Sequence, residues 1–292
     1  MMKMPKLLVA LMMTVCLLLS AATLALGEAP APQTIDLGVG TMQVYDFGDI
    51  KLHAYKTNDV LDDESFLIET TDAVIGLESP AFTANLEEYL QYIAGLGKPM
   101  RSLLLAYHPS GAAVFEGINV IGTKESQAAY ADGGSIRTLN DGFIEAFGGM
   151  FNGSIPEITT LVEAGQITVD GVALIVTPTE EAYDVEISAI NSVYTHMVGA
   201  DVHNILTSIE QIDAMIEQMR SYQDKGYALI LSSHHAPETQ ADVATKMAYL
   251  EMAKEIAESS TSAEAFTAAM NEAFPNYGGA NYLEMSAGAL FP

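Results

Sequence analysis

Two short segments of this chain are too apolar to lie anywhere but inside a folded protein. Ser102–Ala106 reads SLLLA and Ala228–Leu231 reads ALIL. Continuous apolar runs of this length are typical of buried strands in sheets that helices cover. A helical pattern precedes the first segment, and a strand and a further helix near Thr123 follow it. This alternation of strands and helices predicts a mixed α/β fold.

Sequence patterns elsewhere predict further strands and helices. We expect strands at Met42–Phe47, Ile50–Tyr55, Ser65–Glu69, Ala73–Leu77, Ile118–Ile121, Gln166–Val169, Val172–Val176 and Val193–Thr195. We expect helices at 81–95, from Thr123, around Phe143–Phe147, at 209–226, over 243–256, and a final one opened by the pair Thr261 and Glu264. Two strand-rich stretches each lead into strand–helix units. The order predicts a four-layer αββα sandwich, in a single α/β domain over residues 28–292.

The first 27 residues have the composition of a secretory signal peptide. Lys3 and Lys6 begin the segment, residues 7–26 are almost entirely apolar, and Ala25–Gly27 has the small-x-small form of a cleavage site. A membrane anchor is the competing interpretation, because ~20 apolar residues can cross a bilayer. The Pro-rich stretch 28–33 favours cleavage. We therefore expect a secreted or periplasmic protein that has no membrane association after cleavage.

The chain is strongly acidic, with 12 Lys and Arg against 38 Asp and Glu. Removal of the first 27 residues takes two of the basic residues and the only cysteine, Cys16. Such a charge repels nucleic acid phosphates and anionic lipid surfaces, so we expect neither as a partner. Without cysteine the mature chain has no disulfide, thiolate zinc site or cysteine nucleophile. A solvated acidic surface that keeps an exported protein soluble accounts for the charge.

Several catalytic motifs are missing from the sequence. It has no Gly-x-Ser-x-Gly elbow, no phosphate-binding glycine loop with lysine, and no His-Glu-x-x-His. The chemistry then depends on six histidines and selected carboxylates. His108 and His234 both follow buried strands, where α/β folds gather polar groups, and so could share one pocket. The alternative is that each is a hydrogen-bonded loop histidine, while His53, in an early hairpin, is expected at the surface.

The segment Asp63–Leu77, DESFLIETTDAVIGL, resembles the opening hairpin of the metallo-β-lactamase fold. In that family a strand of the type N-S-Y-L-I-E precedes a second strand that ends in aspartate, where this chain has Glu78. Further resemblances lie at Gly97–Pro99, Ser102–Ala106, Val172–Pro178, Gly199–Asp201 and Ile230–His234. The resemblance spans roughly Leu61 to Ile256 and implies the four-layer αββα sandwich of that family.

The family's metal-binding motifs are only partly present. Its first motif, H-x-H-x-D-H, corresponds to AYHPSGA at 106–112, which keeps only His108. The T-P-G-H histidine corresponds to Glu180, the bridging aspartate to Asp201, and the last histidine to His234. The resemblance therefore implies a metal site of His108, Glu180, Asp201 and His234, in which Asp201 and Glu180 also orient water or act as base. Four such ligands can hold at most one zinc ion, or none.

These observations predict a secreted hydrolase of the metallo-β-lactamase fold that acts on a small molecule through a single-metal or metal-free site. The alternative is a non-catalytic secreted binding protein that retains the fold and the pocket. We expect at most one bound zinc and little or no β-lactam hydrolysis. Any hydrolysis should disappear on replacement of Asp201 or His234 by alanine, but not on replacement of His53.

Overall fold

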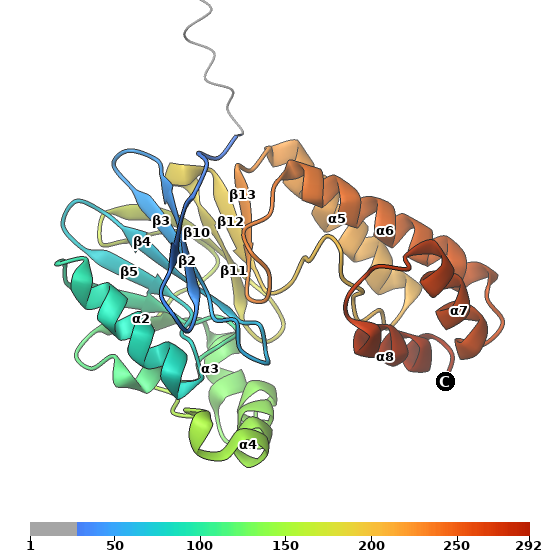
Figure 1. Cartoon of the computed structure of the whole chain (residues 1–292), viewed down its shortest axis with the longest axis horizontal. Coiled ribbons are helices and arrows are strands. Elements are labelled where there is room, and N and C mark those ends of the chain that lie inside the picture. The colour runs from blue at the N-terminus through green and yellow to red at the C-terminus, as the bar shows by residue number, and fades with distance from the viewer. Residues whose placement is uncertain (1–27) are drawn as a thin grey trace, which may run out of the picture.

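The computed structural model describes residues 28–292 (Figure 1). The predicted signal peptide and Cys16 lie outside these described residues. Among residues 28–292, no helix combines the length and the apolar composition that crossing a membrane requires.

The first sheet has eight strands, which lie side by side in chain order. Strands β1 to β5 pair antiparallel, and β5 to β8 pair parallel. Their bounds are β1 (Gln33–Asp36), β2 (Thr41–Asp46), β3 (Lys51–Lys56), β4 (Glu64–Glu69), β5 (Val74–Leu77), β6 (Met100–Leu104), β7 (Asn119–Gly122) and β8 (Thr160–Leu161). The two expected N-terminal hairpins are confirmed, whereas β1 and β8 were not predicted.

The second sheet has five strands in the order β13-β12-β11-β10-β9. Its strands are β9 (Gly165–Val169), β10 (Val172–Pro178), β11 (Tyr183–Ile187), β12 (Ser192–Thr195) and β13 (Leu229–Ser232). Neighbours are antiparallel except β12 and β13, which are parallel. The C-terminal ends of β12 and β13 therefore lie at the same edge of this sheet.

Helices follow the strands in both halves of the chain. They are α2 (Thr83–Gly95), α3 (Lys124–Tyr130), α4 (Ser135–Phe147), α5 (Ile209–Lys225), α6 (Gln240–Ser259), α7 (Ala263–Ala273) and α8 (Ala280–Leu290), with short 3₁₀ turns at Ala112–Val114, Gly148–Met150 and Ser188–Ile190. Local sequence sets their ends: the Ser208 side chain caps α5 by accepting the N–H of Gln211, and Gly226, with φ of 60°, ends it.

Four layers result from the way these elements bury their apolar side chains. Inward-facing residues of both sheets, such as Phe66 and Leu174, form one core between the sheets. On the opposite face of β4, Leu67 packs in a second cluster with Tyr89 of α2. Val193 and Ile230, on the outer face of the second sheet, belong to one apolar cluster with helices α5 to α8, and Figure 1 shows these helices on the side of β13. The expected αββα sandwich is confirmed, and burial of both faces explains the continuous apolar runs.

Two local expectations were wrong. His53 is buried on β3, where its Nε2 lies 2.9 Å from Glu69 Oε2 and its Nδ1 lies 2.8 Å from the Tyr92 hydroxyl. It is not a surface residue because Tyr92, on α2, covers this face of the strand. Ser262, not Thr261, caps α7 by accepting the N–H of Ala265, and α8 follows as the final helix.

Glu64, the first residue of β4, is a buried acid in an unfavourable environment. Its side chain is 1% exposed, and among residues 28–292 its Oε2 has no hydrogen-bond partner. Burial raises the pKa of Glu64 to about 8, against the opposing effect of the Lys56 ammonium. The folded protein therefore holds this carboxyl protonated near neutral pH, where the unfolded chain would ionise it.

We expect Glu64→Gln to stabilise the protein by about 2–3 kcal/mol near pH 7.5. Because the folded pKa of Glu64 is raised, its contribution to stability is complete below about pH 4.5 and is lost as the pH rises towards 8. The gain should therefore vanish near pH 4, as measured by urea unfolding at both pH values. Glu251→Gln, at an exposed position of α6, is the control. Equal stability of Glu64→Gln and the wild type at pH 7.5 would contradict this account.

Candidate metal centre

Three histidine side chains from separate loops meet beyond the C-terminal ends of their strands. His196 is the first residue after β12, His234 is the second after β13, and His108 follows β6. Because β12 and β13 are parallel neighbours, their ends bring His196 and His234 to one edge. One nitrogen from each of the three rings lies within 4.8 Å of the other two. We call these three residues the histidine cluster.

The spacing within the histidine cluster suits one metal ion. The Nε2 atoms of His108 and His196 are 3.4 Å apart. Two imidazole nitrogens on one tetrahedral zinc ion, each about 2.0–2.1 Å from the metal, are about 3.4 Å apart. The His234 ring lies 4.7 Å from the ring of His108 and 5.3 Å from that of His196, centroid to centroid. All three residues therefore offer the ligand type that zinc prefers, and the pair His108 and His196 has the spacing of two ligands on a single zinc ion.

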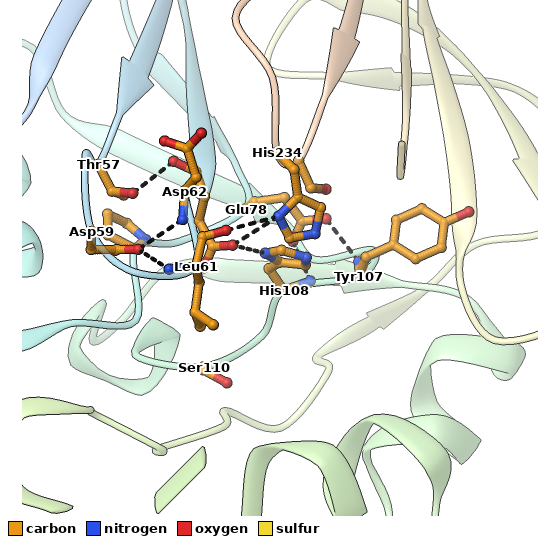
Figure 2. A network of polar contacts seen from close by, with 12 residues as sticks. Thr57, Asp59, Leu61, Asp62, Glu78, Tyr107, His108, Ser110 and His234 are labelled. Carbon is orange, nitrogen blue, oxygen red and sulfur yellow. Dashed lines mark hydrogen bonds and ion pairs between the residues drawn. The ribbon is translucent and has the colours of Figure 1, made fainter. Parts of the chain in front are cut away.

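The buried carboxylate of Asp63 contacts two of the three rings. Its Oδ1 lies 3.2 Å from Nδ1 of His234 and 3.5 Å from Nδ1 of His108. The same Nδ1 of His234 donates to the carbonyl oxygen of Leu61 at 3.3 Å, and Figure 2 shows this loop beside the two rings. Since a carbonyl only accepts, Nδ1 of His234 carries the proton and Nε2 keeps its lone pair for a ligand. Asp63 thus orients ligands, as carboxylates behind metal-bound histidines do.

The protonation of the histidine cluster is uneven. Burial and the neighbouring charges of His108 and His234 lower the pKa of His196 to about 3, so its ring is neutral. Burial also favours a lower pKa for His108, but the effect of the Asp63 carboxylate is larger, and the pKa of His108 is raised. Burial likewise opposes ionisation of Asp63, and the two imidazoles outweigh it and hold its pKa well below the usual range. A metal ion at His108 would therefore compete with a proton that the Asp63 carboxylate favours.

A second carboxylate, Glu78, fixes the backbone that carries His108. It follows β5 and is fully buried, with a φ of 63°. Its Oε1 accepts the N–H of Tyr107 at 2.7 Å, as Figure 2 shows, and its Oε2 accepts the N–H of His108 at 3.0 Å. The Tyr194 hydroxyl also donates to this carboxylate. Glu78 thus holds the loop after β6 in place.

Tyr107 supports the third ring. It stacks on His196 with a centroid separation of 4.5 Å and an interplanar angle of 9°. The Tyr107 hydroxyl donates to Asp184 Oδ1 at 3.1 Å and lies 3.1 Å from the Thr179 hydroxyl. The ring of His196 therefore rests on a tyrosine that is itself held at its far end.

The structure brings together two of the four residues that the sequence resemblance implied. His108 and His234 belong to the histidine cluster, whereas Glu180 and Asp201 are exposed and lie outside it. Glu180 is in the turn between β10 and β11, where it lines an open hollow together with residues of α3. The ligand and catalytic roles of Glu180 and Asp201 stay predictions.

Sequence reasoning did not select His196 or Asp63 for this site. The signal for His196 was present, because it directly follows the expected strand Val193–Thr195, as His108 follows Ser102–Ala106. In the structure, His196 takes the place after β12 at which the sequence resemblance sought an aspartate. Asp63 precedes β4 and has no sequence signal of its own.

Comparisons with known proteins find similarity in structure but not in sequence families. Neither a family model nor a curated protein sequence matches the chain. Among solved structures it is similar to the stereoselective inverting sec-alkylsulfatase Pisa1 from Pseudomonas sp., with a TM-score of 0.57 and 13% identity over 85% of this chain and 49% of the other. It is also similar to a metallo-beta-lactamase family protein from Thermus thermophilus, with a TM-score of 0.55 and 13% identity over 83% and 91% of the two chains.

The two similar proteins differ in how much of their length this chain spans. The chain spans about half of the alkylsulfatase but nearly all of the Thermus protein. At these identities the likeness concerns the fold, and it agrees with the strand order, the two packed sheets and the outer helices described above. The chain has the metallo-β-lactamase fold.

Proposed function

We propose that this protein is a hydrolase of small molecules that uses one zinc ion held by His108, His196 and His234. The observation that carries the proposal is the convergence of three imidazole nitrogens within 4.8 Å of one another. Three histidines that leave a fourth position open are typical of catalytic zinc sites. Zinc bound there supplies Lewis acidity, which activates water and polarises the bond to be cleaved.

The chain's own residues prepare this site. The Asp63 carboxylate lies 3.5 Å from Nδ1 of His108 and 3.2 Å from Nδ1 of His234, and its negative charge favours the proton on these nitrogens, which leaves the Nε2 atoms for the metal ion. The side chains of His108 and His234 are 16% and 19% exposed, which leaves an approach from solvent. We propose a single ion, because the histidine cluster is the one group of three close ligand residues among residues 28–292. Glu180 and Asp201 take no part in the site as we propose it.

Export belongs to the same proposal. The segment 1–27 has the features of a signal peptide, and residues 28–292 would then form the exported domain. The absence of cysteine from residues 28–292 makes the fold independent of the redox state outside the cell. The strong acidic charge argues against nucleic acid and anionic membranes as partners and favours a small-molecule substrate.

Activity measurements on metal-free and reloaded protein test this function. We expect chromogenic small esters to be hydrolysed only after addition of one equivalent of zinc, with little or no turnover of a chromogenic β-lactam. His234→Ala should lose the activity because it removes a ligand, whereas Glu180→Gln, at an exposed position, should keep it. Hydrolysis that persists in the metal-free protein would contradict the proposal. Tight zinc binding with no turnover of any ester would instead favour the non-catalytic binding protein.

A further inference from the structure

The segment that carries His196 has almost no regular structure of its own. Residues 196–208 form neither helix nor strand, and their single bridge pairs Val202 with Gly278. The carbonyl oxygen of His196 accepts the N–H of Ser233 at 2.9 Å, which continues the pairing of β12 with β13, but the irregular residues that follow have no such pairing and need other restraints to stay in place. The residues that restrain positions 199–204 are therefore part of the site, although they lie behind it.

Glu238 makes the first restraint. Its backbone is fixed to β13 by two hydrogen bonds with Ile230, of 2.8 and 2.9 Å. Its buried carboxylate accepts the N–H of Gly199 at 3.1 Å through Oε2 and the N–H of Ala200 at 2.7 Å through Oε1. Both oxygens of one side chain thus hold two successive amides of the irregular segment, in hydrogen bonds strengthened by the carboxylate charge.

Lys246 of α6 makes the second restraint. Its side chain is only 1% exposed, and lysine is almost never fully buried unless its charge is satisfied. Here Nζ donates to the carbonyl oxygen of Val202 at 2.6 Å and to Asn204 Oδ1 at 2.7 Å, and it lies 4.4 Å from the centre of the Tyr249 ring. These partners, together with the burial, exclude a role for Lys246 as a nucleophile towards a substrate from solvent.

Gly199 packs closely against the ring of His235. Gly199 has a φ of 64°, and a Cβ atom there would lie 2.4 Å from Nε2 of His235. The segment therefore passes directly over the ring of the residue that follows His234. Glu238, Lys246 and His235 all belong to the stretch from β13 into α6, which also carries His234.

We infer that Glu238 and Lys246 are positioning residues that hold residues 199–204 and thereby fix His196 opposite His234 before a metal ion binds. This inference rests on the proposed metal site. It differs from the roles of Asp63 and Tyr107, which touch the histidine rings, because Glu238 and Lys246 act through the backbone that carries one of them. Their removal should affect where His196 lies, while the sandwich itself remains folded.

Cobalt binding tests the inference by affinity and by spectrum. We expect Glu238→Gln and Lys246→Met to bind Co²⁺ about 10- to 100-fold more weakly, as is typical when residues behind metal ligands are replaced. Their visible absorption bands should also change, since these report the arrangement of ligands round the ion. Lys254→Met and Glu251→Gln, at positions of the same helix nearer the solvent, are matched controls that should keep the wild-type affinity and spectrum.

Amide hydrogen exchange of the metal-free protein gives an independent readout. The amides of Gly199 and Ala200 should exchange faster in Glu238→Gln, while those of β13 and the interior of α6 stay protected. If the wild type binds no Co²⁺, the proposed function fails and exchange alone decides the inference. If Lys246→Met does not fold, as judged by circular dichroism, Glu238→Gln decides it. Wild-type affinity, spectrum and protection in a folded Glu238→Gln variant would overturn it.

Discussion

Replacement of His196 by alanine should weaken zinc binding by more than about 100-fold, because loss of a direct ligand costs more than the 10- to 100-fold loss typical of a residue behind it. Replacement of Asp201 by alanine should leave zinc binding unchanged. His196 lies 3.4 Å from His108, Nε2 to Nε2, whereas Asp201 is exposed and outside the histidine cluster. The two variants thus separate the site found in the structure from the one implied by sequence resemblance.

Competition with a chromogenic chelator measures both affinities under the same conditions. Thermal unfolding of the metal-free variants is the necessary control, since it shows whether His196→Ala has lost a ligand or its fold. The reverse result, in which Asp201→Ala loses zinc and His196→Ala retains it, would refute the histidine cluster as the metal site. It would restore Asp201 as the ligand after β12.

Replacement of Glu78 by glutamine should destabilise the protein by about 3 kcal/mol. The buried carboxylate accepts hydrogen bonds from the N–H groups of Tyr107 and His108 and from the hydroxyl of Tyr194. An amide of the same size turns one acceptor into a donor and leaves a buried N–H unpaired. Hydrogen bonds to charged groups contribute about 1.5–3 kcal/mol each, and a buried group left without its partner adds to the cost.

Glu88 provides a matched control for this prediction. Its carboxylate also accepts three hydrogen bonds, from the N–H groups of Val39 and Gly40 and from the Tyr55 hydroxyl, but it is partly exposed. Because water can replace a lost partner there, Glu88→Gln should cost only about 1 kcal/mol. Urea unfolding of both variants checks the difference. A loss for Glu78→Gln no larger than that for Glu88→Gln would contradict the structural role of Glu78.

Much of the fold could be predicted because local patterns determine it. The strand Ala228–Leu231 and the apolar stripe of α5 ending at Gly226 are visible without tertiary information, and both elements lie where expected. Strand β11 was not predicted, although Tyr183, Val185 and Ile187 alternate with polar residues as in a strand with one buried face. The two acidic residues between them made the segment resemble a loop. The position of His53 was not readable, because it depends on α2 folding back over β3.

Only part of the candidate site could be predicted from sequence. His108 and His234 stand just after strongly apolar strands, and this local signal identified both. The choice of Asp201 over His196 depended on the number of residues between the end of β12 and the ligand, which a resemblance at low identity does not fix. Asp63 joins the site only because the loop before β4 lies beside the loops after β6 and β13. That contact is a property of the assembled sandwich.

X-ray absorption spectroscopy of the zinc-loaded protein, with metal content measured on the same sample, tests the single-ion histidine site most directly. We predict one zinc per chain, with three imidazole nitrogens at about 2.0–2.1 Å and no second metal nearby. Two zinc ions about 3.5–4 Å apart, or one zinc bound mainly by carboxylate oxygens, would contradict the site formed by His108, His196 and His234.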